Sequence, residues 1–203
     1  PVEAAARLVC RRAELMDACA AGEPTAMAAV LRLTAEQVES LCKEFDRVYP
    51  VNYNCPGQTV VSGCREQVDA LSQRAAALGG RAMRLNVSGA FHSPYMHAAA
   101  DGLRDYLSGL TFAQPAMPVY ANATAQPYGR DAADLLSRQV ESPVKWEQTI
   151  RAMRAAGADT FVECGAGKTL SGLIAKIDPQ VTVLRVENDQ TLNSTLEKLG
   201  GNA

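Results

Sequence analysis

The sequence lacks the features that mark several specialised classes of protein. Its 203 residues carry a net charge of −2 with both signs interspersed, so it has no basic surface of the kind that binds nucleic acids or anionic membranes. No apolar run approaches the ~18 residues that a membrane-spanning helix needs. With 47% hydrophobic and 21% charged residues, wholesale disorder is also excluded. We expect a globular cytoplasmic protein that binds neither nucleic acid nor membrane.

The usual patterns of metal sites and disulfide frameworks are missing too. The six cysteines include no C-x-x-C pair, and no histidine stands at metal-ligand spacing from them, so we expect no metal and no cofactor. A chain of this length builds its core without disulfides, and the cysteines are therefore expected to be reduced thiols. Cys10 and Cys42 are expected at core or boundary positions.

A compact alternation of elements predicts a ferredoxin-like βαββαβ lobe over residues 25–88. The Pro56-Gly57 pair predicts a tight turn between two strands of a hairpin. Met83, Leu85 and Val87 alternate with polar residues, which is the period of a half-buried strand that reaches Ser88. The expected strands are 26–33, 48–54, 58–62 and 81–88, and the expected helices are 35–45 and 64–78.

The residues on either side of the lobe predict an α/β core. Helices that alternate with short apolar strands indicate a parallel sheet, and we assign residues 1–24 and 89–203 to this core, with the lobe as an insertion. The expected helices are 2–19, one that begins at Ser93-Pro94, 131–140, 144–155, 169–177 and 191–199. The expected strands are 115–121, a buried strand at 160–162, and 181–186.

The two histidines, His92 and His97, are not equivalent. His92 lies in the turn between a predicted strand and a predicted helix, where α/β enzymes collect catalytic groups. A hydrogen-bonded loop histidine is the alternative interpretation. His97 falls inside the following helix, away from its apolar stripe, and is expected at the surface.

Arg12 sits in the middle of the apolar stripe of the first helix, among Leu8, Leu15 and Met16. A guanidinium in that position is costly unless an anion meets it. Two interpretations explain the position equally well: a structural ion pair or a side chain that snorkels at the edge of the stripe, and a fork that holds a ligand carboxylate.

The glycine-rich segment from Glu163 to Leu170 fits neither nucleotide-binding template. A phosphate-binding loop needs glycine at Val162, and the dinucleotide fingerprint needs a small residue at Leu170. A plain turn from strand into helix is favoured over a nucleotide site. The sequence also contains no G-x-S-x-G nucleophile elbow.

Taken in order, several segments resemble the family of acyl carrier protein S-malonyltransferases, the malonyl-CoA:acyl carrier protein transacylases of fatty acid synthesis. The resemblance runs from Pro1 to about Leu199. The matching segments are Arg7-Leu8-Val9 with Arg12, residues 25–30, 52–63 and 87–93 with Met96, 142–146, and 163–170. The implied fold is a parallel-sheet, α/β-hydrolase-like acyltransferase domain, incomplete in this chain, with an inserted ferredoxin-like lobe.

The resemblance implies a ping-pong transfer of malonyl from malonyl-CoA to acyl carrier protein through a serine ester. His92 would be the catalytic base, oriented by the backbone carbonyl of Gln139. Arg12 would bind the malonate carboxylate, and Phe91 would narrow the pocket against branched acyl groups. The expected partners are malonyl-CoA and acyl carrier protein, and the full-length enzyme is expected to be a monomer.

One part of the family pattern is missing. The family's serine, in a G-H-S-x-G elbow, and its glutamine-containing oxyanion loop both precede the helix at which this chain begins. We expect the chain to be the C-terminal two-thirds of such an enzyme, without transacylase activity alone. A polyketide synthase acyltransferase domain, and a non-catalytic lobe that binds acyl carrier protein or acyl-CoA, are the alternatives.

Overall fold

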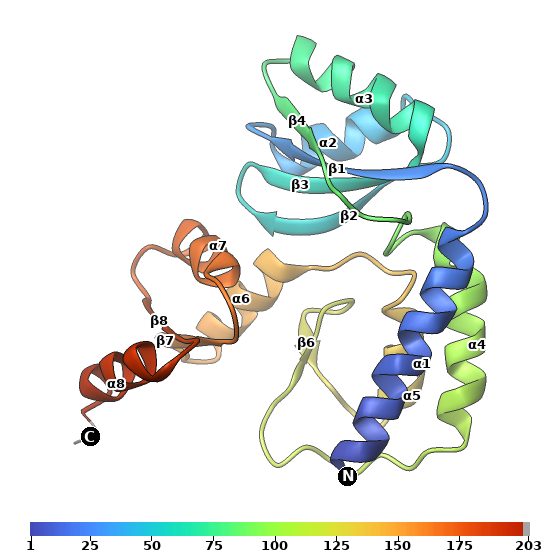
Figure 1. The fold of residues 1–203 in the computed structure, drawn as a ribbon. Helices are drawn as coiled ribbons and strands as arrows, with labels where there is room; N and C mark the ends of the chain where they lie inside the picture. Colours follow the sequence, from blue (N-terminus) through green and yellow to red (C-terminus); the bar gives the residue numbers. More distant parts are fainter. Residues whose placement is uncertain (201–203) are drawn as a thin grey trace. The chain divides into compact units, whose positions relative to one another are not determined.

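The computed structural model describes residues 1–200, which divide into a unit of residues 1–149 and a second unit that begins at Ile150. Figure 1 shows the helices and strands of both units in chain order. Within the described part, no helix combines the length and the apolar character needed to cross a membrane. The six cysteines, all within this part, are free thiols.

The predicted ferredoxin-like topology is present in the first unit. Its four strands form an antiparallel sheet in the order β2-β3-β1-β4, and the hairpin turns at Gly57 with φ +72°. The division of the chain into a core of residues 1–24 and 89–203 and an inserted lobe stays a prediction. The elements are β1 Thr25–Leu31, α2 Ala35–Cys42, β2 Val48–Cys55, β3 Gln58–Cys64, α3 Arg65–Ala77 and β4 Arg81–Arg84.

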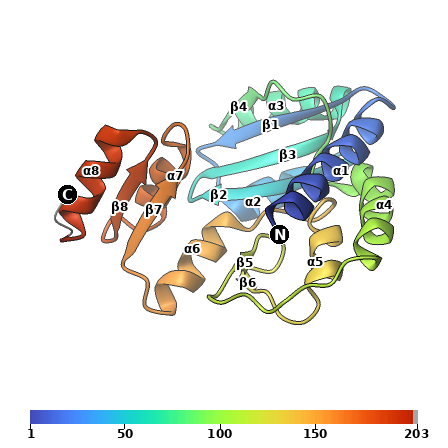
Figure 2. The ribbon, with the colours of Figure 1, turned by 60° about the horizontal axis from the view of Figure 1, so that its bottom comes forward.

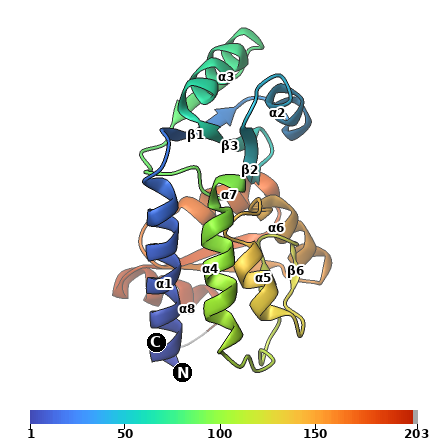
Figure 3. The same ribbon diagram turned by 90° about the vertical axis from the view of Figure 1, so that its right-hand side faces the viewer.

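Alternation along β1 gives the sheet two buried faces. Ala26, Ala28 and Val30 pack with residues of both α2 and α3, so both helices cover the same face, as Figure 3 shows. Met27 and Ala29 point to the opposite face, where Phe91 packs against the sheet. The sheet thereby connects its own core to the segment that carries His92.

Three helical segments pack together beside this sheet. They are α1 Val2–Ala20, α4 His97–Ser108 with a short 3₁₀ turn at Pro94–Met96 before it, and α5 Ala132–Arg138; Figure 3 shows them side by side. Gly102 of α4 lets α1 approach closely, because a Cβ there would lie 2.8 Å from the Leu15 side chain. The shared core contains Met16, Met96, Ala99, Ala100, Leu103, Leu107 and Val140.

The predictions for the end of β4 and for Cys10 are wrong in detail. β4 ends at Arg84 instead of Ser88, and Met83 and Val87 are 45% and 42% exposed. The reason is that β4 pairs with β1 only as far as Ala28; one more backbone bond, from Leu85 N to the Met27 carbonyl, follows. Cys10 is exposed rather than at the core, whereas Cys42 is buried as expected.

The strand expected at 115–121 is largely absent. Only β5 Tyr120–Ala121 forms, and it pairs antiparallel with β6 Gln126–Pro127, which was not predicted. Pro115 and Pro118 lack the N–H that a sheet ladder needs. No other strand in the part of the chain that the structure describes pairs with residues 115–119.

The segment before the last helix of this unit joins the edge of the antiparallel sheet. Val144 N donates to the Val51 carbonyl at 2.7 Å, and Tyr53 N donates to the Val144 carbonyl at 2.9 Å. The chain then enters α6 Trp146–Ala155, which contains the boundary between the units. Residues 139–145 are therefore tied to β2 at one end.

The second unit contains the predicted parallel pairing. β7 Thr160–Cys164 and β8 Thr182–Val186 run parallel, connected by α7 Thr169–Ile177, and α8 Asp189–Lys198 follows. β7 is not the buried strand that was expected, because Val162 is 40% exposed. A parallel strand is buried only where both of its faces are covered, and the side of β7 that carries Val162 is open.

Candidate functional site

A cavity of about 250 Å³ in the first unit brings together residues that are far apart in the sequence. Arg12 reaches it from α1, His92 from the turn before α4, and Gln139 from the end of α5. Three of the four predicted site residues therefore share one cavity. Its other lining residues are Leu8, Val9, Leu103, Asn122 and Leu136.

The backbone at His92 is held in an uncommon conformation. Its φ is +61°, in the left-handed region that non-glycine residues seldom adopt. The neighbouring turn fixes it, because Ser93 Oγ donates to the Ala90 carbonyl at 2.6 Å and accepts from Tyr95 N at 3.3 Å. Strain of this kind persists where the surrounding structure determines it, and it clusters at functional sites.

The imidazole of His92 is oriented by a backbone carbonyl. His92 Nδ1 lies 3.1 Å from the Gln139 carbonyl oxygen. Gln139 is the C-cap residue of α5, so this oxygen has no partner within the helix. With Nδ1–H as donor, Nε2 carries the lone pair that can accept a proton.

The environment of His92 favours the neutral ring. Burial lowers the pKa of His92 below its ordinary value, and the charge of Arg12 adds to this effect; hydrogen bonds to the backbone of Gln139 and of Ser142 oppose it. A neutral imidazole with the lone pair on Nε2 is the form that a general base requires near neutral pH.

Arg12 is half-buried at the cavity. Burial lowers the pKa of its guanidinium, and no described residue provides a carboxylate or another side-chain partner for it. The structural ion pair is therefore not formed within residues 1–200, and the snorkelling side chain and the carboxylate fork stay as interpretations. A half-buried cation at a cavity wall is suited to an anionic ligand.

Phe91 and His97 lie outside the cavity lining. Phe91 packs against the helical core and against the face of the sheet opposite α2 and α3, so its role in acyl selection stays a prediction. His97 is at the surface, as expected, with its side chain 69% exposed and Nδ1 2.8 Å from Glu141 Oε2. The hydrogen bond to Glu141 and the charge of Asp101 raise the pKa of His97.

The sequence reasoning missed Asn122 and Tyr128. Asn122 lines the cavity, and the Gln139 side chain contacts both of them. Neither residue belongs to a recognisable motif. Only the pairing of the short strands β5 and β6 places them beside Gln139.

The two histidines should titrate on opposite sides of the ordinary imidazole pKa of about 6.5. In an NMR titration of imidazole resonances, we expect His92 to protonate below that pH and His97 above it. His97 stabilises the fold below about pH 6.5, and this contribution is lost as pH rises through its folded pKa. Because the pKa of His92 is lowered in the folded chain, the stability of the fold decreases as pH falls below about 6.5. Equal pKa values for the two rings would contradict this description.

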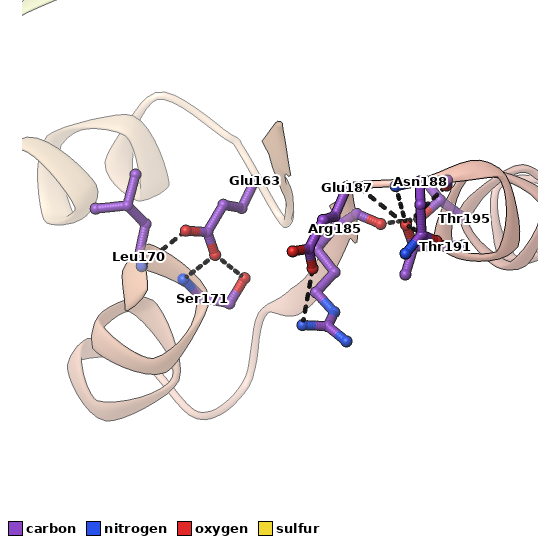
Figure 4. Close-up of polar contacts among 8 residues, drawn as sticks. All are labelled: Glu163, Leu170, Ser171, Arg185, Glu187, Asn188, Thr191 and Thr195. Atoms are coloured by element: carbon purple, nitrogen blue, oxygen red, sulfur yellow. Dashed lines mark hydrogen bonds and ion pairs between the residues drawn. The ribbon is translucent and has the colours of Figure 1, made fainter. Parts of the chain in front are cut away.

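The glycine-rich turn between β7 and α7 is occupied by a carboxylate of the chain itself. Glu163 accepts hydrogen bonds from Leu170 N at 3.0 Å and from Ser171 N and Oγ at 2.8 and 2.5 Å (Figure 4). These bonds, led by the Ser171 hydroxyl, lower the pKa of Glu163. Two amides of the first turn of α7 are therefore already bonded to this carboxylate, which favours the plain turn over an anion site at this helix N-terminus.

Replacing Glu163 with glutamine should loosen this turn. The loss of a charged helix cap should lower the free energy of local unfolding at this helix start by about 1 kcal/mol at pH 7. The measurement is amide hydrogen exchange, which should be faster at Leu170 and Ser171. The carboxylate contributes above the ordinary Glu pKa of about 4.3, and this contribution is lost as pH falls through the lower folded value. Glu187→Gln is the matched control, because the Glu187 carboxylate pairs with Arg185 at 3.8 Å and caps no helix among residues 1–200. Equal exchange in both variants would show that Glu163 is not a cap.

Comparisons with known proteins identify the relatives of this chain. The family model for the acyl transferase domain matches residues 1–178. The malonyl CoA-acyl carrier protein transacylase of Bacillus subtilis is 34% identical over 196 residues, which are 93% of this chain and 62% of the relative. The polyketide biosynthesis protein PksE of Bacillus subtilis is 39% identical over 183 residues, 86% of this chain and 23% of the relative.

Solved structures give the same result. The malonyl CoA-acyl carrier protein transacylase of Clostridium perfringens has a TM-score of 0.92 at 37% identity, covering 96% of this chain and 63% of that one. A malonyl-transacylase solved with its type II PKS acyl-carrier protein has a TM-score of 0.91 at 33% identity, covering 95% and 64%. The chain thus spans less than two thirds of the length of these proteins. The similarity of the structures confirms the predicted acyltransferase fold. Because the family model covers most of its length, the chain belongs to the acyl transferase domain family, with malonyl CoA-acyl carrier protein transacylases among its relatives.

Proposed function

We propose that this chain supplies the catalytic base and the carboxylate-binding residue of a malonyltransferase. The reaction is transfer of malonyl from malonyl-CoA to the phosphopantetheine thiol of acyl carrier protein. The observation that carries the proposal is one cavity that holds Arg12, without a carboxylate partner among the described residues, and His92, with its Nδ1 hydrogen-bonded to the Gln139 carbonyl. The names of the relatives support the choice of acyl group and acceptor.

His92 would move one proton in each half of the reaction. As a serine oxygen attacks the thioester carbonyl, Nε2 takes the hydroxyl proton and then gives it to the departing CoA thiolate. The thiol of acyl carrier protein next gives its proton to Nε2 and attacks the serine ester, and the serine recovers the proton as it leaves. The Gln139 carbonyl accepts from Nδ1–H throughout and stabilises the transient imidazolium.

Arg12 would hold the free carboxylate of the malonyl group. Its planar fork allows two parallel hydrogen bonds to one carboxylate, which a lysine cannot reproduce. Since an acetyl group has no carboxylate, Arg12 would leave an unpaired cation in the cavity when acetyl-CoA is bound. That difference would select malonyl over acetyl.

The chain by itself is proposed to be inactive, because its 203 residues contain no G-x-S-x-G elbow. The proposal is tested with a fusion in which the segment of a family member that carries the G-H-S-x-G serine precedes Pro1. We expect the fusion to transfer malonyl to acyl carrier protein. A folded fusion that binds acyl carrier protein without transferring malonyl would instead support the non-catalytic alternative.

A polyketide pathway is the second candidate, and the 39% identity to PksE favours it. The chemistry would be the same, and only the acceptor would differ. Assaying the fusion with acyl carrier proteins from fatty acid and polyketide synthesis would separate the two, because the preferred acceptor should show the higher kcat/KM.

A further inference from the structure

We propose that the Gln139 side chain, held by Tyr128 and Asn122, is a clamp that positions the Gln139 carbonyl and so fixes His92 in its Nδ1–H tautomer. Gln139, Tyr128 and Asn122 are called the clamp below. The inference deepens the proposed function, because the tautomer matters for catalysis only if His92 is the base. It can nevertheless be tested without any acyl transfer.

Gln139 is bonded at each of its polar groups. Its backbone N–H donates to the Leu135 carbonyl at 3.0 Å, and its carbonyl accepts from His92 Nδ1 at 3.1 Å. Its side-chain Oε1 accepts from Asn122 N at 3.0 Å, while Nε2 donates to the Tyr128 hydroxyl. A C-cap residue that bonded only through its backbone could fray with the helix end. The two side-chain bonds oppose that motion.

The hairpin that receives the side chain is itself well bonded. Asn122 opens the turn after β5 and Tyr128 directly follows β6, so the two partners flank the hairpin strands; the hairpin lies beside α5 in Figure 2. Tyr128 N donates to the Val119 carbonyl at 2.8 Å, and Lys145 N donates to the Asn122 carbonyl at 2.9 Å. The clamp is therefore anchored to the hairpin and to the chain that continues into α6.

Burial supports the same interpretation. Tyr128 and Gln139 are both half-buried, and burial raises the pKa of the Tyr128 hydroxyl, which therefore keeps its proton at neutral pH. The bond between Gln139 and Tyr128 is partly buried, and a bond shielded from water is harder to exchange for bonds to solvent. The bond from Asn122 N is exposed. The arrangement explains how a neutral carbonyl at a helix end can hold an imidazole in one orientation.

The chain offers a direct readout, because it contains only two histidines. Imidazole ¹⁵N NMR of the 203-residue chain reports the tautomer and the pKa of His92, with exposed His97 as an internal reference. In the wild-type chain we expect a single Nδ1–H tautomer for His92. Gln139→Leu keeps the backbone carbonyl and removes both side-chain bonds, and Tyr128→Phe removes one hydroxyl. Both should give mixed tautomers and a His92 pKa still further below about 6.5, because the bond to the Gln139 carbonyl raises that pKa.

Tyr120→Phe is the matched control, since Tyr120 lies in the same hairpin and its hydroxyl makes no hydrogen bond to another described residue. It should leave His92 unchanged. If Gln139→Leu fails to fold, Tyr128→Phe decides alone. An unchanged His92 tautomer and pKa in a folded clamp variant would overturn the inference, as would an equal change in Tyr120→Phe.

The fusion separates this inference from the proposed function. Tyr128→Phe should lower kcat for malonyl transfer about ten-fold with little change in KM, because Tyr128 does not line the cavity and acts only through Gln139 and His92. If the wild-type chain shows the fixed tautomer but the folded fusion transfers no malonyl, the proposed function is contradicted and the clamp is still supported. Transfer that is unaffected in a variant with mixed tautomers would overturn the positioning role.

Discussion

Replacing His92 with alanine in the fusion should slow malonyl transfer by about 10²- to 10⁴-fold, the usual contribution of a general acid–base group. The loss should fall mainly on kcat, because the imidazole moves protons in the transition state and contributes little to substrate binding. Steady-state rates with malonyl-CoA and acyl carrier protein provide the measurement. The wild-type kcat/KM should also decline as pH falls through the lowered pKa of His92.

His97→Ala is the matched control for His92→Ala. His97 lies five residues further along the chain, exposed and paired with Glu141 at the surface, so its loss should leave the rate within about two-fold of wild type. A fusion with His92→Ala that transfers malonyl at the wild-type rate would remove His92 from the mechanism.

Arg12→Ala should reduce the preference of the fusion for malonyl-CoA over acetyl-CoA by about 10- to 100-fold. A charge-assisted hydrogen-bonded contact contributes about 1.5–3 kcal/mol, and each 1.4 kcal/mol is a factor of ten. The ratio of kcat/KM for the two substrates measures the effect. Arg12→Lys should recover part of it, because the charge remains and the planar fork is lost.

Arg11→Ala provides the control on the same helix. Arg11 is exposed and pairs with Glu14 at 3.1 Å, so its removal changes the net charge equally without reaching the cavity. Discrimination between malonyl and acetyl should stay as in wild type for Arg11→Ala. Unchanged discrimination in Arg12→Ala would refute the carboxylate-binding role.

The local chemistry of the ferredoxin-like lobe made it predictable. Thr34 and Gln37 form a reciprocal capping box at the start of α2, with bonds of 3.2 and 2.8 Å, and such pairs are readable in sequence. Gly57 supplies the positive φ of the hairpin turn. Alternation along β1 then places its residues on two faces. Each of these features depends on neighbours in the chain.

The secondary-structure and burial predictions that were wrong concern features that depend on contacts with residues far away in the sequence. The alternation through Val87 has the period of a strand, yet the strand ends at Arg84 where pairing with β1 ends. The arms of the β5–β6 hairpin are two residues each, too short to produce a periodic pattern. Val162 is apolar like a buried residue, but its exposure depends on what covers β7.

The site residues also divide into those that could be predicted from the sequence and those that could not. The position of Arg12 on an apolar stripe and of His92 in a strand-to-helix turn could be read from the residues, and the resemblance proposed the Gln139 carbonyl. The structure adds that the three share one cavity. The positions of Asn122 and Tyr128 could not be predicted. They bind the side chain of Gln139, and such a contact between distant residues has no sequence motif.

The most direct test of the central claim is intact-mass spectrometry of malonyl-ester formation after mixing with malonyl-CoA. The wild-type fusion should gain one malonyl group rapidly, the fusion with His92→Ala should gain it at least about 100-fold more slowly, and the 203-residue chain alone should stay unmodified. Malonylation of the chain alone followed by transfer to acyl carrier protein, or equal rates in the two fusions, would contradict the account.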